Sequence, residues 1–152
     1  MGDKYAATGY QTAVEAAPSE TALAVIAATV VRGRIYDLLF SHGAAPADTV
    51  IEWTVSRFSA VGTEGAGVTP APLDSDAPAA NLDAGEDHSA EPTYTAATEL
   101  LEFDLNQRAT FRWVAAPGGE LVVPATAGNG IGARPAGAAY TGIAQCTAHW
   151  EE

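Results

Sequence analysis

The chain has 152 residues, a mass of 15.5 kDa and a formal net charge of −12, from 19 acidic residues against 7 Lys and Arg. This length suits one domain with a core of its own. The negative charge repels phosphate backbones and anionic lipid headgroups, so we expect no direct binding to nucleic acid and no binding to a membrane.

Cys146 is the only cysteine, so an intrachain disulfide is excluded. The residues after Met1 lack the basic stretch and apolar run of a secretory signal. We therefore expect the protein to be made in the cytoplasm of the cell that produces it and not exported by the usual route.

The first clear strand pattern comes only after an N-terminal segment with few large apolar residues. Residues 1–18 contain few large apolar side chains and predict an extended N-terminal arm, with a short helical turn at Thr12–Ala17 as the alternative. Leu23–Phe40 is rich in β-branched and aromatic residues, and Arg32-Gly33-Arg34 interrupts it. This run predicts two strands or one long bent strand.

The next segments differ sharply in polarity. In Val50–Val61 apolar and polar residues alternate, which predicts a half-buried strand. Residues 62–97 are rich in Gly, Pro, Ala and acidic side chains, and they predict one long acidic loop.

A second group of strands follows. Leu101–Leu105 alternates, Asn106-Gln107 can turn the chain, and Ala109–Val114 is apolar again, which together predict a hairpin. Leu121–Val123 predicts a short strand, Ala127–Gly137 predicts a Gly-rich loop, and Ala138–Trp150 predicts a C-terminal strand.

This succession of short strands without an amphipathic helix predicts an all-β fold. We expect a single-domain β-sandwich, jelly-roll-like, over residues 19–152, with the arm at residues 1–18 and the long loop at about 62–97.

The sequence gives only weak signals for catalytic or metal-binding residues. Cys146 and His149 lie three apart on one predicted strand, so their side chains point to opposite faces. Asp74-Ser75-Asp76 and Glu86-Asp87-His88 supply possible metal ligands but match no EF-hand spacing. A solvated loop is the simpler interpretation, and we expect no metal.

Two further patterns imitate known sites. Gly128–Gly132 lacks the lysine and the following helix of a phosphate-binding loop. Glu102 and Asp104 share one strand face, as a glycosidase pair could, but nothing selects them over the other acids. We therefore expect no catalytic residues, no cofactor and no enzymatic activity.

Most aromatic residues fall within the predicted strands, where core packing is their simplest role. Arg108 and Arg112 point to the strand face opposite Phe111 and Trp113, and we expect both arginines to make specific contacts. With two tyrosines of the arm, they form the predicted set of partner contacts: Tyr5, Tyr10, Arg108 and Arg112.

The stretch Asn106–Leu121, the later Asn129-Gly130-Ile131-Gly132 and the closing His149-Trp150-Glu151-Glu152 resemble small virion proteins of tailed bacteriophages. The resemblance covers Ser19 to the end and carries no catalytic motif. It implies a capsid decoration or cement protein that forms a homo-oligomer, a dimer or trimer, on the capsid surface of the virion and binds the major capsid protein. In that role the arm and the long loop would contact capsid subunits.

Two other interpretations of the function remain open. A tail or head-fibre component, or a single-jelly-roll capsid protein, could use the same fold. A carbohydrate-binding module would need an exposed aromatic platform, for which Trp53, Trp113 and Trp150 are the candidates.

Overall fold

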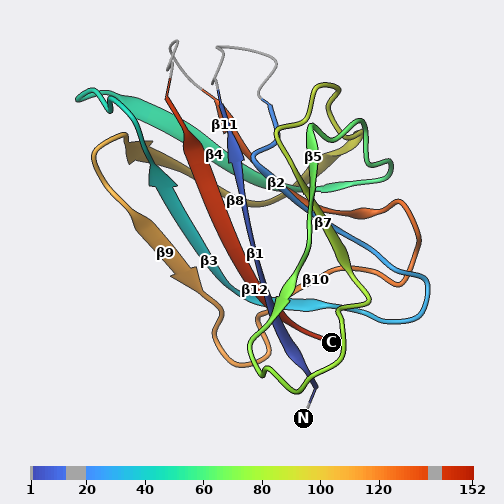
Figure 1. Cartoon of the computed structure of the whole chain (residues 1–152). Coiled ribbons are helices and arrows are strands. Elements are labelled where there is room, and N and C mark those ends of the chain that lie inside the picture. The colour runs from blue at the N-terminus through green and yellow to red at the C-terminus, as the bar shows by residue number, and fades with distance from the viewer. Residues whose placement is uncertain (1, 13–19, 137–141) are drawn as a thin grey trace.

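The computed structural model describes residues 2–12, 20–136 and 142–152, which form strands and no helix (Figure 1). Within these residues there is accordingly no helix that could cross a membrane. The strands in chain order are β1 (Lys4–Gln11), β2 (Leu23–Ile26), β3 (Arg34–His42), β4 (Val50–Phe58), β5 (Ala66–Val68), β6 (Ala71–Pro72), β7 (Asp83–Glu86), β8 (Tyr94–Asn106), β9 (Phe111–Val114), β10 (Leu121–Val122), β11 (Gly130–Ala136) and β12 (Ala144–Glu151).

The strands form two antiparallel sheets that face each other. The first, which we name the β3 sheet, has the order β10-β3-β12-β1-β6, and β9 also pairs with β3. The second, the β4 sheet, has the order β5-β7-β2-β11-β4-β8. The prediction of an all-β sandwich is confirmed.

Eight of these strands have the pairing of a jelly roll. They lie as β1-β12-β3-β9 in one sheet and β2-β11-β4-β8 in the other. The first of the eight thus pairs with the last, the second with the seventh, the third with the sixth and the fourth with the fifth. A long hairpin rolled into two layers gives this order, so the jelly-roll prediction is also confirmed.

The core lies between the sheets and is dominated by aromatic rings. Trp53, Trp150 and Phe40 are fully buried. The Phe40 and Trp53 ring centroids are 5.0 Å apart in an edge-to-face arrangement that joins the two sheets. The two strands predicted within Leu23–Phe40 and the strand predicted within Val50–Val61 are confirmed as β2, β3 and β4.

The N-terminal arm is a correction. Lys4–Gln11 forms β1, which pairs along its whole length with β12, so the sandwich begins before residue 19. Its inward positions include Ala7 and Gly9, and a Cβ at Gly9 would lie 2.5 Å from the Ala22 carbonyl oxygen. Small residues bury little area, so the sequence pattern of this strand was weak. Residues 13–18 of the predicted arm lie outside the described residues.

Two connections also differ from the predictions. Asn106-Gln107 does not close a hairpin, because β8 pairs with β4 and β9 pairs with β3 in the other sheet. The segment predicted as a Gly-rich loop contains β11, which lies between β2 and β4. Gly130 is required there, since a Cβ would lie 2.4 Å from the Val25 carbonyl oxygen.

The predicted acidic loop 62–97 is only partly a loop. It contains the short strands β5, β6 and β7 and the start of β8. The C-terminal strand is confirmed as β12, and residues 138–141 of its predicted range lie outside the described residues.

Candidate interaction surface

On one side of the sandwich the sheets end in edge strands that no further strand covers, and we name this the open side. β8 pairs only with β4, and β9 and β10 pair only with β3, so these three strands are sheet edges. An edge strand presents unpaired backbone N–H and C=O groups and is a place where another chain can attach.

Apolar side chains line this open side between the sheet edges. Register places them opposite core residues: Phe103 opposite Trp53, Phe111 opposite Phe40 and Trp113 opposite Leu38. The inner neighbours are buried, whereas these edge side chains keep part of their surface in water. We name the group the apolar seam, and its members are Leu101, Phe103, Phe111, Trp113 and Leu121.

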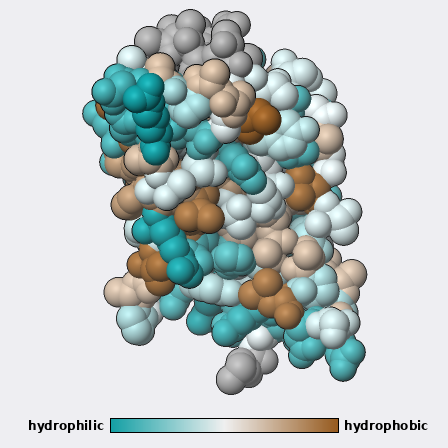
Figure 2. Space-filling view, turned by 60° about the vertical axis from the view of Figure 1, so that its left-hand side comes forward, coloured by the Kyte–Doolittle hydropathy of each residue, from teal (hydrophilic) through white to brown (hydrophobic). Residues whose placement is uncertain are grey.

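Aromatic contacts hold the seam together. The ring centroids of Phe103 on β8 and Phe111 on β9 are 4.6 Å apart, and both rings pack against Phe40. On the neighbouring surface over β9 and β3, brown apolar side chains are separated by pale and teal ones (Figure 2). The surface there therefore mixes apolar and polar groups.

The chain crosses between the sheets at Asn106–Thr110, and polar contacts fix this crossing. The Asn106 side-chain amide donates to Asp48 Oδ1 at 2.7 Å, and the Gln107 amide donates to Thr49 Oγ1 at 2.8 Å. Arg108 is exposed and its Nε donates to the Pro46 carbonyl oxygen at 3.3 Å. Arg108 thus has a specific contact within its own chain.

Arg112 on β9 binds the buried carboxylate of Asp37 on β3. Its Nε and Nη2 donate to the two oxygens of Asp37 at 2.9 and 2.8 Å. His149 Nδ1 on β12 lies 2.9 Å from Asp37 Oδ2. These hydrogen bonds, that of Arg112 first, hold the pKa of Asp37 below its ordinary value although burial opposes them.

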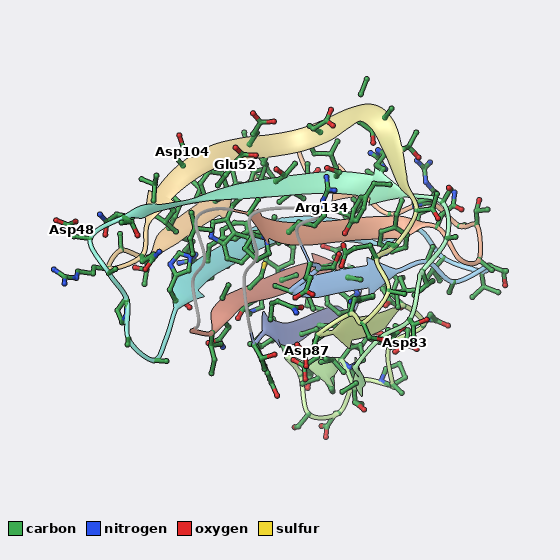
Figure 3. The ribbon with its side chains drawn as sticks, turned by 90° about the horizontal axis from the view of Figure 1, so that it is seen from above. Asp48, Glu52, Asp83, Asp87, Asp104 and Arg134 are labelled. Atoms are coloured by element: carbon green, nitrogen blue, oxygen red, sulfur yellow. The ribbon has the colours of Figure 1, made fainter. Side chains whose placement is uncertain are left out.

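The outer face of the β4 sheet is acidic at one end. Glu52 of β4 is directly opposite Asp104 of β8, and Glu102 follows on the same face. Figure 3 shows Glu52 and Asp104 close together, with Asp48 beyond them. Among the described residues, Asp37 is the only acidic residue in a salt bridge. Glu52, Glu102 and Asp104 therefore have no cationic partner there.

Elsewhere this outer face is covered by the protein's own side chains. The Arg134 guanidinium lies 3.8 Å from the centre of the Tyr94 ring, and the Tyr94 hydroxyl is 2.7 Å from Thr21 Oγ1. Burial raises the pKa of Tyr94. The hydroxyl therefore stays protonated and serves as a structural contact.

The opposite side of the sandwich is closed by the connection between β6 and β7. Leu82 enters the core and is 2% exposed. The Glu152 carboxylate accepts hydrogen bonds from the backbone N–H groups of Asn81 and Leu82 and from Trp150 Nε1. The Tyr5 hydroxyl donates to the Pro78 carbonyl oxygen at 3.1 Å.

The structure separates the four predicted partner contacts. Tyr5 is 1% exposed and belongs to the core, so its prediction as a surface contact is wrong. Tyr10 is 38% exposed at the far end of β1. Arg108 and Arg112 lie at the open side, but both already have partners within the chain.

The structure also shows where the candidate catalytic and metal-binding residues of the sequence analysis lie. Cys146 is fully buried and burial raises the pKa of its thiol, whereas His149 points outward to Asp37, so the predicted divergence is confirmed. Asp87 accepts from Thr12, and Glu86 accepts from the backbone N–H of Tyr10. No group of three or more His, Cys, Asp or Glu within the described ranges is arranged to hold a metal ion.

The aromatic platform of a carbohydrate-binding module is a further correction. Trp53 and Trp150 are both 0% exposed, so Trp113 alone of the three reaches the surface. The seam and Asp37 were missed by sequence reasoning. The signal for Asp37 was present, since a carboxylate inside the apolar run Ile35–Phe40 must find a partner when it is buried.

No protein-family model, no curated protein and no solved structure matches this chain.

Proposed function

We propose that this chain is a structural subunit that works by binding other protein subunits, as a decoration or cement protein on the head of a tailed bacteriophage. The observation that carries the proposal is the apolar seam along the open side, because its aromatic side chains remain partly in water beside unpaired strand edges. A second protein surface would remove this area from water and stabilise both. No catalytic step is part of the role.

Two further features support the phage setting. The jelly roll is shared by viral capsid domains and by lectins, which is an analogy of fold. The stretch Asn106–Leu121, which resembles small virion proteins, supplies Phe111, Trp113 and Leu121 of the seam. Its partners would be the major capsid protein and copies of itself, on the outer capsid surface.

The partner contacts would come from the seam and not from an N-terminal arm. Deleting residues 1–18 would remove β1 and the pairing of β12 with it, so such a deletion would unfold the sandwich. A point change at the surface is therefore the better probe of attachment.

The first experiment counts copies by quantitative mass spectrometry of purified particles. A simple symmetry-related ratio to the major capsid protein is expected for a decoration protein. A few copies per particle would move the chain to the tail or a fibre, and absence from particles would contradict the proposal.

The second experiment tests the open side next to the seam with two matched substitutions. Val114 follows Trp113 on β9, lies on the other face of that strand and is 58% exposed, and Leu73 on the closed side is 54% exposed. Val114→Ser is expected to weaken co-sedimentation with particles that lack the protein, whereas Leu73→Ser is expected to leave it unchanged. Both substitutions should change the free energy of unfolding by less than about 0.5 kcal/mol. Equal binding by the two variants would exclude this side as the attachment surface.

A further inference from the structure

The basic side chains of this acidic protein are few, and most have a partner. Lys4 lies over the Tyr36 ring, and Arg57, Arg108, Arg112 and Arg134 donate hydrogen bonds to Val122, Pro46, Asp37 and Ser56. Only the side chains of Arg32 and Arg34 make no hydrogen bond, salt bridge or ring contact with the part of the chain that the structure describes.

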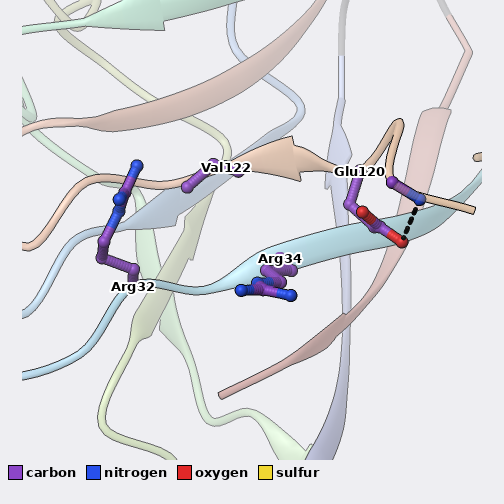
Figure 4. Close-up of a pocket in the computed structure, with 5 residues that line it drawn as sticks. Arg32, Arg34, Glu120 and Val122 are labelled. Carbon is purple, nitrogen blue, oxygen red and sulfur yellow. Dashed lines mark hydrogen bonds between the residues drawn. The ribbon is translucent and has the colours of Figure 1, made fainter.

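The two unpaired arginines line the same hollow. It has a volume of about 320 Å³ and is formed by Arg32, Arg34, Gly118, Glu120 and Val122. Figure 4 shows Arg34 between Arg32 and Glu120, with Val122 on the neighbouring strand. The hollow lies where β10 pairs with the start of β3, at the same open side as the apolar seam.

Glu120 is held at the far end of the hollow. Its carboxylate accepts the backbone N–H of Gly118 at 3.2 Å. Hydrogen bonds from its own backbone N–H and that of Gly118 hold the pKa of Glu120 below its ordinary value, and the positive charge of Arg34 adds to the effect. Glu120 is therefore ionised at neutral pH and is occupied by its own turn.

The lining charge selects the kind of ligand. Two guanidinium groups and one carboxylate leave one positive charge, which suits a singly charged group better than a doubly charged phosphate. Guanidinium groups bind carboxylates through two parallel hydrogen bonds, and Arg112 with Asp37 shows that arrangement in this chain. The net charge of −12 also opposes a nucleic-acid backbone.

We propose that the hollow between β3 and β10 binds a carboxylate side chain of a neighbouring protein subunit, with Arg32 and Arg34 as the donors. The assignment of the carboxylate to a protein subunit rests on the proposed function; the affinity of the hollow for a carboxylate does not. We take this subunit to be a second copy of the chain, whose Glu52 and Asp104 have no cationic partner among the described residues; a capsid protein as the source is the other outcome of the test.

The ligand chemistry is tested by NMR on the whole protein through the arginine Nε–Hε resonances. The probe is the peptide acetyl-Gly-Glu-Gly-Glu-Gly-amide, the control peptide has Gln in place of Glu, and inorganic phosphate is the comparison anion. The Arg32 and Arg34 resonances are expected to shift saturably with the Glu peptide while those of Arg112 and Arg57 stay in place. Arg32→Lys/Arg34→Lys, which keeps the charge and loses the planar fork, should weaken binding about tenfold.

Three results would overturn the carboxylate site. They are equal shifts with the Gln peptide, shifts that follow only the ionic strength, and tighter binding of phosphate than of the Glu peptide. The substitutions fall on exposed side chains, so loss of binding through unfolding is checked by the unchanged core resonances of the variants.

The source of the carboxylate is tested with Arg32→Ala/Arg34→Ala and with Lys4→Ala as the control at an exposed basic residue. If a second copy supplies it, sedimentation velocity shows self-association that the double variant loses and the control retains. If a capsid protein supplies it, the double variant stays monomeric like the parent and loses co-sedimentation with particles.

An unchanged double variant in both measurements would refute the role of the hollow in assembly. The two proposals fail separately: absence of the protein from particles refutes the virion role, while the peptide titration decides the site without particles.

Discussion

The two sides of the sandwich are built from the same two sheets, but they differ in what covers them. On the closed side, the connection between β6 and β7 places Leu82 in the core, and Glu152 binds its backbone. On the open side, Phe103, Phe111 and Trp113 keep part of their surface in water. The protein's own chain covers one side, and we infer that another chain covers the other.

The open side is also protected against unspecific pairing. β8 is the longest strand and an edge, which by itself invites aggregation. Ala97 has a left-handed φ of 56°, and Glu99, Glu102 and Asp104 place charges along the strand. These features break regular strand addition, so a partner must fit the side chains of this edge.

The sharpest test of the comparison uses the same substitution on both sides. Leu82→Ala on the closed side removes a fully buried side chain and is expected to lower the free energy of unfolding by about 3 kcal/mol. Leu101→Ala in the seam removes a side chain that is already partly hydrated, so we expect a loss of about 1 kcal/mol. Urea unfolding followed by tryptophan fluorescence measures both, and equal losses would show that the open side is as well packed as the closed side.

A second test removes the hydrogen bonds by which Glu152 holds the connection on the closed side. Glu152→Ala leaves the N–H groups of Asn81, Leu82 and Trp150 without their acceptor, so the free energy of unfolding should fall by about 2 kcal/mol. Asp76→Ala, at an exposed residue of the same connection, is the control and should change it by less than about 0.5 kcal/mol. Amide hydrogen exchange of residues 73–82 should accelerate in the Glu152 variant alone. Unchanged exchange would mean that Leu82 holds the connection without help.

The smallest expected effect concerns the ion pair that fastens β9 on the open side. The folded-state pKa of Asp37 is lowered from its ordinary value of 3.8, so its stabilisation is present above that pH and is lost as the pH falls below it. Asp37→Asn should cost about 1 kcal/mol at pH 7, a modest value because the Arg112 side chain is 63% exposed. Urea unfolding of parent and variant between pH 7 and pH 2.5 should therefore converge at the acid end. A gap that stays constant would assign the cost to packing and not to charge.

How far the sequence could predict the structure depended on the size of the inward residues. Ile51, Trp53 and Val55 bury large areas at a period of two, and β4 was predicted from them. The buried positions of β1 and β11 include Ala7, Gly9, Gly130, Gly132 and Ala133, whose pattern is weak, and the two strands were predicted as an arm and a loop. Their place is decided by the neighbours, because only small residues let β2 approach them closely.

The candidate surface was less predictable than the fold. The sequence indicated that Phe111 and Trp113 lie opposite Arg112 on a strand, and the structure confirms it. It could not indicate that this strand is an edge, because the pairing partner of a strand is set by contacts between residues far apart in the chain. The unpaired state of Arg32 and Arg34 has the same origin, since it depends on which carboxylates the fold brings within reach.

The sequence by itself determined the all-β class, the absence of an intrachain disulfide and the strong negative charge. These follow from composition and from local alternation of side chains, which need no knowledge of distant contacts. Only the tertiary structure decided that residues 4–11 complete a sheet, that Tyr5 is core, and that one side of the sandwich stays open. The physical reason is that burial and edge position are properties of the packed sheets and of no single segment.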